Sequence, residues 1–395
     1  MLPFLAGYYL SYVFRAVNAV LGPTLAAEFT LNATELGFLT GVYFFSFGLF
    51  QIPLGLLLDR FGPRRTNGAL LVLAAAGGLA FAWAESFESL VLARALIGLG
   101  VSACLMATIQ AFVLWFPPER TGTMIALAYS MGGLGAITAS APLEAALGHF
   151  SWREIFVFLS ACTLTLAAFM AFWVPERRLQ AKGAPLAGLR EILRDGAFWR
   201  VAIAIGTNQC AVVSLFTLWI IAWLRDVAGY ERAAAAAALA WVAVALIAGY
   251  FFFGRLGDLR ARRGQSQLPL FAAGVAGSVL MLLLLALGVT TAAVAIWAAF
   301  VFFGTGATLA HSIATRRFPR EMAGRVNTAL NTFTFFGIFI GQWATGAVLN
   351  QFPPTAVGGE AGYDPRGYAY AFGALALVQA AGLAWLWSGR RLLIR

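Results

Sequence analysis

Charge is scarce in this chain of 395 residues. Lys, Arg, Asp and Glu make up only 11% of the sequence, whereas apolar residues make up 61% and the mean hydropathy is +0.81. A soluble domain is typically about 25% charged. The shortage therefore excludes a soluble globular enzyme, a disordered protein and a fibrous protein. The apolar runs are about 20 residues long and lack the alternation of barrel strands, so they predict an all-α membrane protein.

Cysteines and catalytic motifs are also few. Cys104, Cys162 and Cys210 lie within apolar stretches without CxxC spacing, which supports neither a disulfide framework nor a zinc site. The sequence has no P-loop, HExxH or GxSxG motif, which argues against an ATP-driven pump, a zinc protease and a lipase. We therefore expect no enzymatic activity, no cofactor and no metal.

Twelve apolar segments are each long enough to cross a bilayer core of about 30 Å as a helix. The first six cover residues 4–27, 35–58, 67–85, 89–115, 122–148 and 152–174. The other six cover residues 198–224, 232–254, 267–288, 291–315, 324–350 and 367–389. The long polar stretch between them predicts two six-helix halves, 1–174 and 198–395, joined by a linker at 175–197.

The basic residues gather on one side of this topology. Of the 27 Lys and Arg, 21 fall in alternate loops, the linker and the C-terminal tail, whereas four fall on the opposite side and two within spans. Positive charge collects on the cytoplasmic side, so both termini are predicted to be cytoplasmic. This distribution explains the net charge of +10 without a nucleic-acid partner.

Two sequence patterns each occur twice, and nearly the same number of residues separates the two copies in both cases. Gly55 to Arg65 follows the second span, and Gly254 to Arg263 follows the eighth span 199 residues later. Phe116-Pro-Pro-Glu-Arg-Thr-Gly122 follows the fourth span, and Phe318-Pro-Arg-Glu-Met-Ala-Gly324 follows the tenth, 202 residues later. A parallel repeat of two six-helix halves is typical of secondary transporters that bind substrate near the membrane midplane.

At these residues the sequence resembles the major facilitator superfamily. The signature of that family's loop between helices two and three is matched by Gly55, Asp59, Arg60, Gly62, Arg64 and Arg65, with a degenerate copy that includes Asp258. Arg94-x-x-x-Gly98-x-Gly100 looks like the family's second motif. The resemblance implies alternating access by two rocking halves, with Asp59 in a cytoplasmic gate, and a chain that usually works as a monomer.

Arg15 is the ion closest to the membrane centre, about eleven residues into the first span. A helical wheel puts it on one polar stripe with Tyr8, Tyr12 and Asn18. A guanidinium binds a carboxylate or phosphate bidentately and keeps its charge at any working pH, so one interpretation is a substrate-anion site. The alternative is a structural arginine bonded to backbone carbonyls. An arginine here also resembles the first helix of organic-anion members of the superfamily.

Arg94 and Glu144 are the other ions within spans. Consecutive antiparallel helices could bring them together as a buried structural pair. The alternative is that Glu144 carries a coupling proton, since it is the only acid within a span. The second half has no acid within a span, which makes an acid-rich sodium site unfavourable and favours proton coupling, exchange or uniport.

Uncharged polar residues supply further candidates. Asn327 and Asn331 share one face of the eleventh span, Ser214 lies on a weaker polar face of the seventh, and Tyr129 lies on the fifth. Such residues often bond to neighbouring helices instead of substrates.

His311 is either an interfacial histidine or part of a proton relay. Gly37-x-x-x-Gly41 and Gly337-x-x-x-Gly341 predict close helix approach.

The sequence as a whole predicts a secondary transporter for a small organic anion, a carboxylate or phosphate ester, in a bacterial inner membrane. Arg15 anchors the anion in this hypothesis, Tyr12 and Asn331 orient it, and transport is coupled to protons or proceeds by exchange. An efflux antiporter for amphipathic drugs or a siderophore is the alternative. A third class, a transporter-derived sensor or a membrane enzyme, lacks the signalling domain or the catalytic constellation that it needs.

Overall fold

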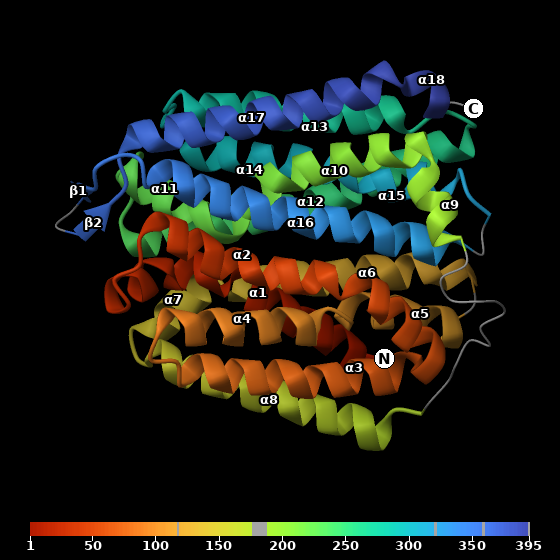
Figure 1. Ribbon diagram of the computed structural model, residues 1–395, viewed down its shortest axis with the longest axis horizontal. Coiled ribbons are helices and arrows are strands. Elements are labelled where there is room, and N and C mark those ends of the chain that lie inside the picture. Colours follow the sequence, from red (N-terminus) through yellow and green to blue (C-terminus); the bar gives the residue numbers. More distant parts are fainter. Residues whose placement is uncertain (117, 176–187, 320–321, 358–359, 394–395) are drawn as a thin grey trace.

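The computed structural model describes residues 1–116, 118–175, 188–319, 322–357 and 360–393. Its helices run roughly along the long axis of the molecule, and both chain termini lie at the same end (Figure 1). We call this the terminal end, and the opposite end, which carries a small β-hairpin, the hairpin end. Residues 176–187 of the predicted linker, and 117, 320 and 321 of the second repeated pattern, lie outside the described residues.

The helices fall into two groups that lie side by side in chain order (Figure 1). The first group comprises α1 (Leu2–Glu28), α2 (Ala33–Leu49), α3 (Gln51–Ala82), α4 (Phe87–Val101), α5 (Cys104–Trp115), α6 (Pro118–Thr138), α7 (Ala141–Leu147) and α8 (Trp152–Trp173). The second comprises α9 (Leu189–Arg194), α10 (Gly196–Ser214), the π-helix η1 (Leu215–Trp219), α11 (Ile220–Asp226), α12 (Arg232–Arg262), α13 (Leu268–Ala286), α14 (Ala293–Gly304), the 3₁₀-helix η2 (Thr305–Thr308), α15 (Leu309–Thr315), α16 (Ala323–Leu349), α17 (Pro365–Ser388) and α18 (Arg390–Leu393). Between α16 and α17, strands β1 (Thr355–Val357) and β2 (Glu360–Gly362) pair antiparallel, with Thr355 opposite Gly362.

Local sequence explains where several helices begin. The Asn32 side chain accepts a hydrogen bond from the backbone N–H of Glu35, whose carboxylate accepts one from the backbone N–H of Asn32, at the start of α2. Ser151 and Glu154 form the same reciprocal arrangement before α8. Each arrangement satisfies two backbone donors that a helix start otherwise leaves without partners.

The twelve predicted spans each have a helical counterpart. Within the described part of the chain, ten helical segments are long and apolar enough to cross a membrane. The shorter apolar α2, and α6 followed by α7, account for the remaining two. The predicted break between the second and third spans, near residue 60, is present: Gly62 leaves helical geometry with φ +81° and separates two helical parts of α3. Glycine tolerates this left-handed backbone, and Pro63 follows it.

The two groups touch along their length. Helix α2 packs against α16, and α6 packs against α12. A Cβ atom on Gly37 would lie 2.5 Å from the carbonyl oxygen of Gln342, and one on Gly41 would lie 2.9 Å from the Phe339 ring. The absence of a side chain therefore permits this approach, as the sequence predicted for the Gly37–Gly41 pair.

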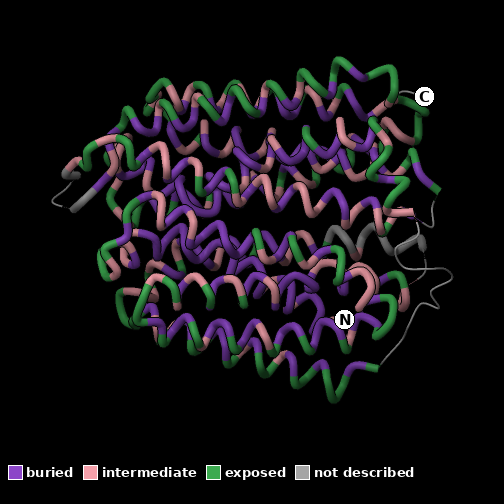
Figure 2. The backbone as a smooth tube through the Cα atoms, viewed as in Figure 1, coloured by how far each residue is buried: buried purple, intermediate pink, exposed green. Residues whose placement is uncertain are grey.

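The outer surface is strongly apolar. Buried residues fill the interior of the bundle, and exposed residues alternate along the outward faces of the outer helices (Figure 2). Large apolar side chains remain exposed on several of these faces, including Leu92 at 67%, Trp241 at 69% and Leu377 at 71%. Such extensive apolar exposure suits a surface in contact with lipid.

Candidate functional site

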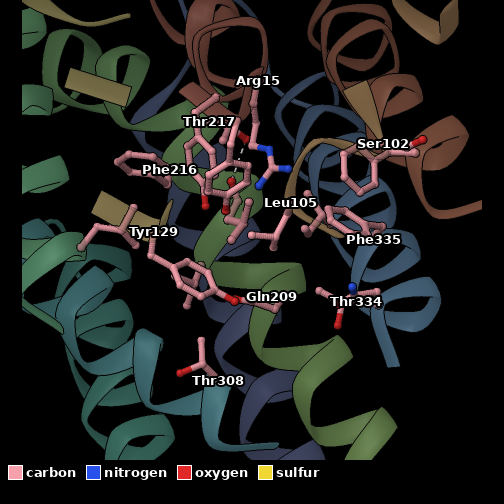
Figure 3. A pocket seen from close by; sticks show the side chains of 18 of the residues that line it. Arg15, Ser102, Leu105, Tyr129, Gln209, Phe216, Thr217, Thr308, Thr334 and Phe335 are labelled. Atoms are coloured by element: carbon pink, nitrogen blue, oxygen red, sulfur yellow. Dashed lines mark hydrogen bonds between the residues drawn. The ribbon is translucent and has the colours of Figure 1, made fainter. Parts of the chain in front are cut away.

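A cavity of about 100 Å³ lies between the two groups of helices. Arg15 projects into it from one side, and Tyr129, Gln209, Thr308 and Phe335 surround it (Figure 3). Polar and aromatic side chains from both groups form much of its wall, namely Tyr8, Tyr12, Arg15, Gln51, Ser102, Tyr129, Gln209, Thr217, Tyr250, Thr308, His311, Asn331 and Thr334. Concave sites with a few convergent polar groups are typical places for small ligands.

Arg15 supplies the positive charge of this cavity. Its side chain is only 8% exposed, and its guanidinium carbon lies 4.5 Å from the centre of the Tyr12 ring and 5.4 Å from that of Phe47. Among the residues that the structure describes, no carboxylate forms an ion pair with it, and its Nε has no hydrogen-bond partner. Aromatic faces stabilise a cation modestly, but they do not neutralise it. The arrangement leaves a positive charge at the cavity wall without a carboxylate partner among the described residues.

Tyrosines continue the wall from one group of helices to the other. The rings of Tyr8 and Tyr12 on α1 meet edge to face with centroids 5.2 Å apart. Tyr8 faces Tyr129 of α6 at 6.3 Å, and Tyr129 faces Tyr250 of α12 at 5.5 Å. Tyrosine combines an apolar ring with a hydroxyl that can both donate and accept, so this surface suits a small ligand with apolar and polar faces.

The second group of helices contributes uncharged polar groups. Gln209 of α10 and Asn331 of α16 line the cavity. His311 of α15 also lines it, and its Nδ1 lies 3.1 Å from Oδ1 of Asn327 on α16. Asn327 itself is not a lining residue and instead positions the imidazole. The wall is therefore electrostatically asymmetric, with the arginine on one side and amides and an imidazole on the other.

Interruptions in the helices bring further residues to the cavity. Ser102 lies between α4 and α5, and Thr308 ends the 3₁₀ segment between α14 and α15. These two breaks are separated by close to the 202-residue offset of the repeated patterns. Thr217 lies within the π-helix η1, and the amide of Gln342 donates a 2.7 Å hydrogen bond to its hydroxyl. π-Helical turns recur at functional sites because they redirect side chains.

The predicted substrate residues divide into two sets. Tyr12, Arg15, Tyr129 and Asn331 line the cavity, and Asn327 contacts a lining residue. Two further residues predicted to bind substrate do not line the cavity. The buried Asn18 amide donates to the Thr40 hydroxyl at 3.0 Å, and Ser214 donates to the backbone carbonyl of Cys210. Both polar side chains thus bond within the helix packing, as membrane helices often require.

The predicted pair between Arg94 and Glu144 is not formed. Arg94 is completely buried against the rings of Tyr43 and Phe81, and its three guanidinium nitrogens have no hydrogen-bond partner among the described residues. Glu144 instead lies 2.7 Å from Nε of Arg232 on α12. The physical reason is the break at Ser140, because the chain bends there between α6 and α7 and directs Glu144 toward the other group of helices.

The predicted gating pattern, residues 55–65, lies within α3 around the break at Gly62, toward the terminal end. The charge of Arg325 on α16 acts on Asp59, which links the two groups at this end. Arg60 stacks on Phe61 with 5.2 Å between the guanidinium carbon and the ring centre. Arg64 donates a hydrogen bond to the backbone carbonyl of Ala171 on α8.

The other members of the pattern differ in their surroundings. Arg65 lines a groove between α3 and α8, whereas Gly55 has no atom within 4 Å of where a Cβ would lie. Asp258, in the degenerate copy on α12, is exposed. The two copies of the pattern therefore have different environments in this conformation.

Sequence analysis overlooked Gln209 and Tyr250 as cavity residues. Gln209 immediately precedes Cys210 in an apolar span, and Tyr250 is the only hydroxyl-bearing residue between 233 and 254. The sequence signal that could have identified them is an isolated polar residue within a long apolar run. Only the rotation of each helix about its axis reveals which of them reach the cavity.

The sequence profile described as Major Facilitator Superfamily matches residues 4–342 of this chain. The chain is 25% identical over 303 residues to the probable sulfoacetate transporter of Cupriavidus necator, covering 70% of this chain and 69% of the relative. It is 24% identical over 366 residues to the probable galactarate/D-glucarate transporter of Bacillus subtilis, covering 82% and 79%.

The fold is also similar to a solved structure. The inward-facing, unoccupied crystal structure of a bacterial homolog of the human lysosomal transporter Spinster aligns with a TM-score of 0.76 and 17% identity. The alignment covers 100% of this chain and 96% of that one. This likeness shows that the two chains share a fold.

Proposed function

The chain belongs to the Major Facilitator Superfamily and is a multi-pass membrane transporter, and from this premise we propose that it moves a small organic anion by alternating access. The relatives named above are a probable sulfoacetate transporter and a probable galactarate/D-glucarate transporter, and these compounds are organic acids. They favour an organic-acid substrate and do not favour an efflux antiporter for drugs or a siderophore. The substrate class that we propose is a carboxylate, sulfonate or phosphate ester small enough for the cavity.

One observation carries the proposal. Arg15 lines the cavity as a buried cation without a carboxylate partner in the described part of the chain. Burying an uncompensated charge is costly, and an anionic ligand offsets that cost while gaining bidentate, charge-assisted hydrogen bonds. A neutral sugar or a lipophilic cation gains neither advantage.

The remaining cavity residues orient the substrate. In this proposal Tyr12 and Tyr129 hold it beside Arg15 from the first half, and Asn331 and Gln209 contact it from the second half. A ligand that bridges the halves responds to their relative motion, which alternating access requires. The halves that we propose are residues 1–174 and 198–395, joined by the linker at 175–197.

We propose a bacterial inner membrane with both termini in the cytoplasm. The terminal end carries both termini and the helices α9 and α18, which contain Arg190, Arg194, Arg390 and Arg391, and positive charge favours the cytoplasmic side. Transport is driven by protons or proceeds by exchange, and the functional unit is a monomer that requires no cofactor and binds no nucleic acid.

Ligand-dependent thermal stability of the purified full chain tests the anion. Sulfoacetate, galactarate and D-glucuronate form the anionic panel, D-xylose is the neutral probe, and tetraphenylphosphonium is the lipophilic cation. A ligand at 100 times its Kd stabilises the folded state by about 2.7 kcal/mol. We expect at least one anion to raise the melting temperature, whereas xylose and tetraphenylphosphonium leave it unchanged.

Variants then locate the binding charge. Arg15→Gln is expected to weaken anion binding about 10- to 100-fold, and Arg15→Lys to have a smaller effect because it keeps the charge without the bidentate geometry. Arg255→Gln, at an exposed position on α12, is the matched control and should bind like wild type. Stabilisation of wild type and Arg15→Gln by the cation alone would refute the anion proposal.

A further inference from the structure

His311 is a titratable group within the cavity to which the anion proposal assigns no role. It lies on α15, three residues after Thr308, which Figure 3 shows on the far side of the cavity from Arg15. An ordinary imidazole changes its charge between pH 5 and 8. Arginine keeps its charge throughout that range, so Arg15 is unsuited to releasing a proton during transport.

The contact with Asn327 fixes which nitrogen is available. Nδ1 of His311 lies 3.1 Å from the amide oxygen Oδ1 of Asn327. That oxygen only accepts, so Nδ1 carries the hydrogen in the neutral ring and the lone pair belongs to Nε2. Nε2 can then take up a proton without disturbing the bond to Asn327, because both nitrogens of a charged imidazole are donors.

Among the described residues that line the cavity, no carboxylate is present to hold the imidazolium. Around the cavity, α1 presents Tyr8, Tyr12 and Arg15, α6 presents Tyr129, and α12 presents Tyr250. Helices α10 and α16 face it with the non-titrating Gln209, Asn327 and Asn331, and α13 contains no titratable residue. On α16, Arg325 acts on Asp59 at the terminal end. Glu144 is not a lining residue and pairs with Arg232.

We propose that His311 binds the coupling proton at Nε2, so that the proton and the substrate anion occupy the cavity together. This inference rests on the proposed anion transport. A protonated His311 and Arg15 repel each other in a cavity of low dielectric, and an anion between them compensates both charges. Anion binding therefore favours proton binding, and by linkage the proton strengthens anion binding to the same extent. The proton comes from water on one side of the membrane and returns to water on the other side.

The experiment compares the two histidines of the chain, His149 and His311. Affinity for galactarate is measured between pH 5.5 and 8.5 in the purified full chain, and proton movement is followed in vesicles loaded with a pH-sensitive dye. Wild type is expected to lose affinity by up to about tenfold per pH unit above the titration midpoint. His311→Gln should lose this pH dependence and the proton movement, and its affinity for galactarate should stay near the low value that wild type reaches at high pH. His149→Gln, at an exposed position after α7, should behave like wild type.

A second variant tests the same group in a chain that keeps the histidine. Asn327→Asp places a carboxylate beside Nδ1, which should raise the pH midpoint of galactarate binding by about one unit or more. An unchanged midpoint in Asn327→Asp, or pH-dependent binding that survives in His311→Gln, overturns the inference. If wild type binds no anion of the panel at any pH, the proposed function fails first. Anion binding that is independent of pH in wild type refutes the role of His311 alone.

Discussion

The Nε atom of Arg232 lies 2.7 Å from Oε1 of Glu144 and joins α12 of the second half to α7 of the first. The same guanidinium donates through Nη2 to the hydroxyl of Thr24 on α1 at 3.1 Å. Both contacts lie at the hairpin end, whereas the charge of Arg325 acts on Asp59 at the terminal end. Electrostatic interactions between the two groups of helices thus occur at both ends of the molecule.

Breaking the hairpin-end link should open that end. We expect Glu144→Gln and Arg232→Gln each to increase the labelling rate of a cysteine introduced at Ala222, which lines a second cavity, of about 660 Å³, beside Arg232. Both partners are partly exposed, so a double-variant cycle should give a coupling energy of at most about 1 kcal/mol. The charge-reversed pair, Glu144→Arg with Arg232→Glu, should restore slow labelling. Additive effects in the cycle would show that the two side chains act independently.

A methyl group at Gly37 should disrupt the contact between α2 and α16. Its Cβ would meet the carbonyl oxygen of Gln342 at 2.5 Å, and this atom belongs to a helix backbone that cannot turn aside. Gly37→Ala is therefore expected to destabilise the protein by about 1–3 kcal/mol. Gly55→Ala is the matched control and should change stability by less than about 0.5 kcal/mol, since the space around it is open. Thermal unfolding of the purified protein measures both, and equal melting temperatures would contradict the close packing.

Two asparagines should separate stability from affinity. Asn18 is buried and bonded to Thr40, so Asn18→Ala is expected to cost about 1 kcal/mol of stability without weakening anion binding. Asn331 lines the cavity, so Asn331→Ala is expected to weaken anion binding about 3- to 10-fold with little change in stability. Melting temperatures and binding isotherms on both variants check this. If Asn18→Ala instead weakened anion binding and Asn331→Ala instead lowered stability, Asn18 would belong to the binding site.

Asp195 should make stability depend on acid pH. It precedes α10 outside the spans, and its Oδ2 lies 2.7 Å from Nε of Arg317. Burial raises the pKa of Asp195, but hydrogen bonds from Arg317 and the backbone amides of Ala197 and Phe198 outweigh it and hold the pKa below its ordinary value. A lowered pKa means that the stabilisation is complete above the ordinary value of about 4 and disappears as the pH falls through the lowered value.

Asp195→Asn isolates this effect, because asparagine still caps a helix but has no charge. We expect wild type to melt at a higher temperature than the variant at pH 7, and the difference to shrink as the pH falls below about 4. Arg317→Gln should reproduce the loss at pH 7. A difference in melting temperature that stays constant down to pH 3 would exclude the ion pair as its cause.

Helix number, the internal repeat and the family pattern were predictable from the sequence. The apolar runs identify spans because an unpaired backbone cannot lie in lipid. The Gly55–Arg65 pattern and its copy after residue 254 predicted two related halves. Arg15 was also recognisable, since a cation deep in an apolar run requires a partner, a cavity or a ligand.

The partners of the polar residues could not be read from the chain. Asn18 and Tyr12 share one polar stripe of α1, yet Asn18 bonds to Thr40 and Tyr12 lines the cavity. Glu144 was predicted to pair with Arg94 on a consecutive helix, but it pairs with Arg232, 88 residues away in the other half.

Sequence by itself determined that this protein crosses a membrane many times, that its halves repeat and that one central arginine needs an explanation. Hydrophobicity and charge decide these properties locally, residue by residue. Only the tertiary structure decided that Tyr250, Gln209 and His311 share a cavity with Arg15. The reason is physical: membrane helices associate through packing of small residues and a few hydrogen bonds, and the rotation that results sets which polar face meets the cavity.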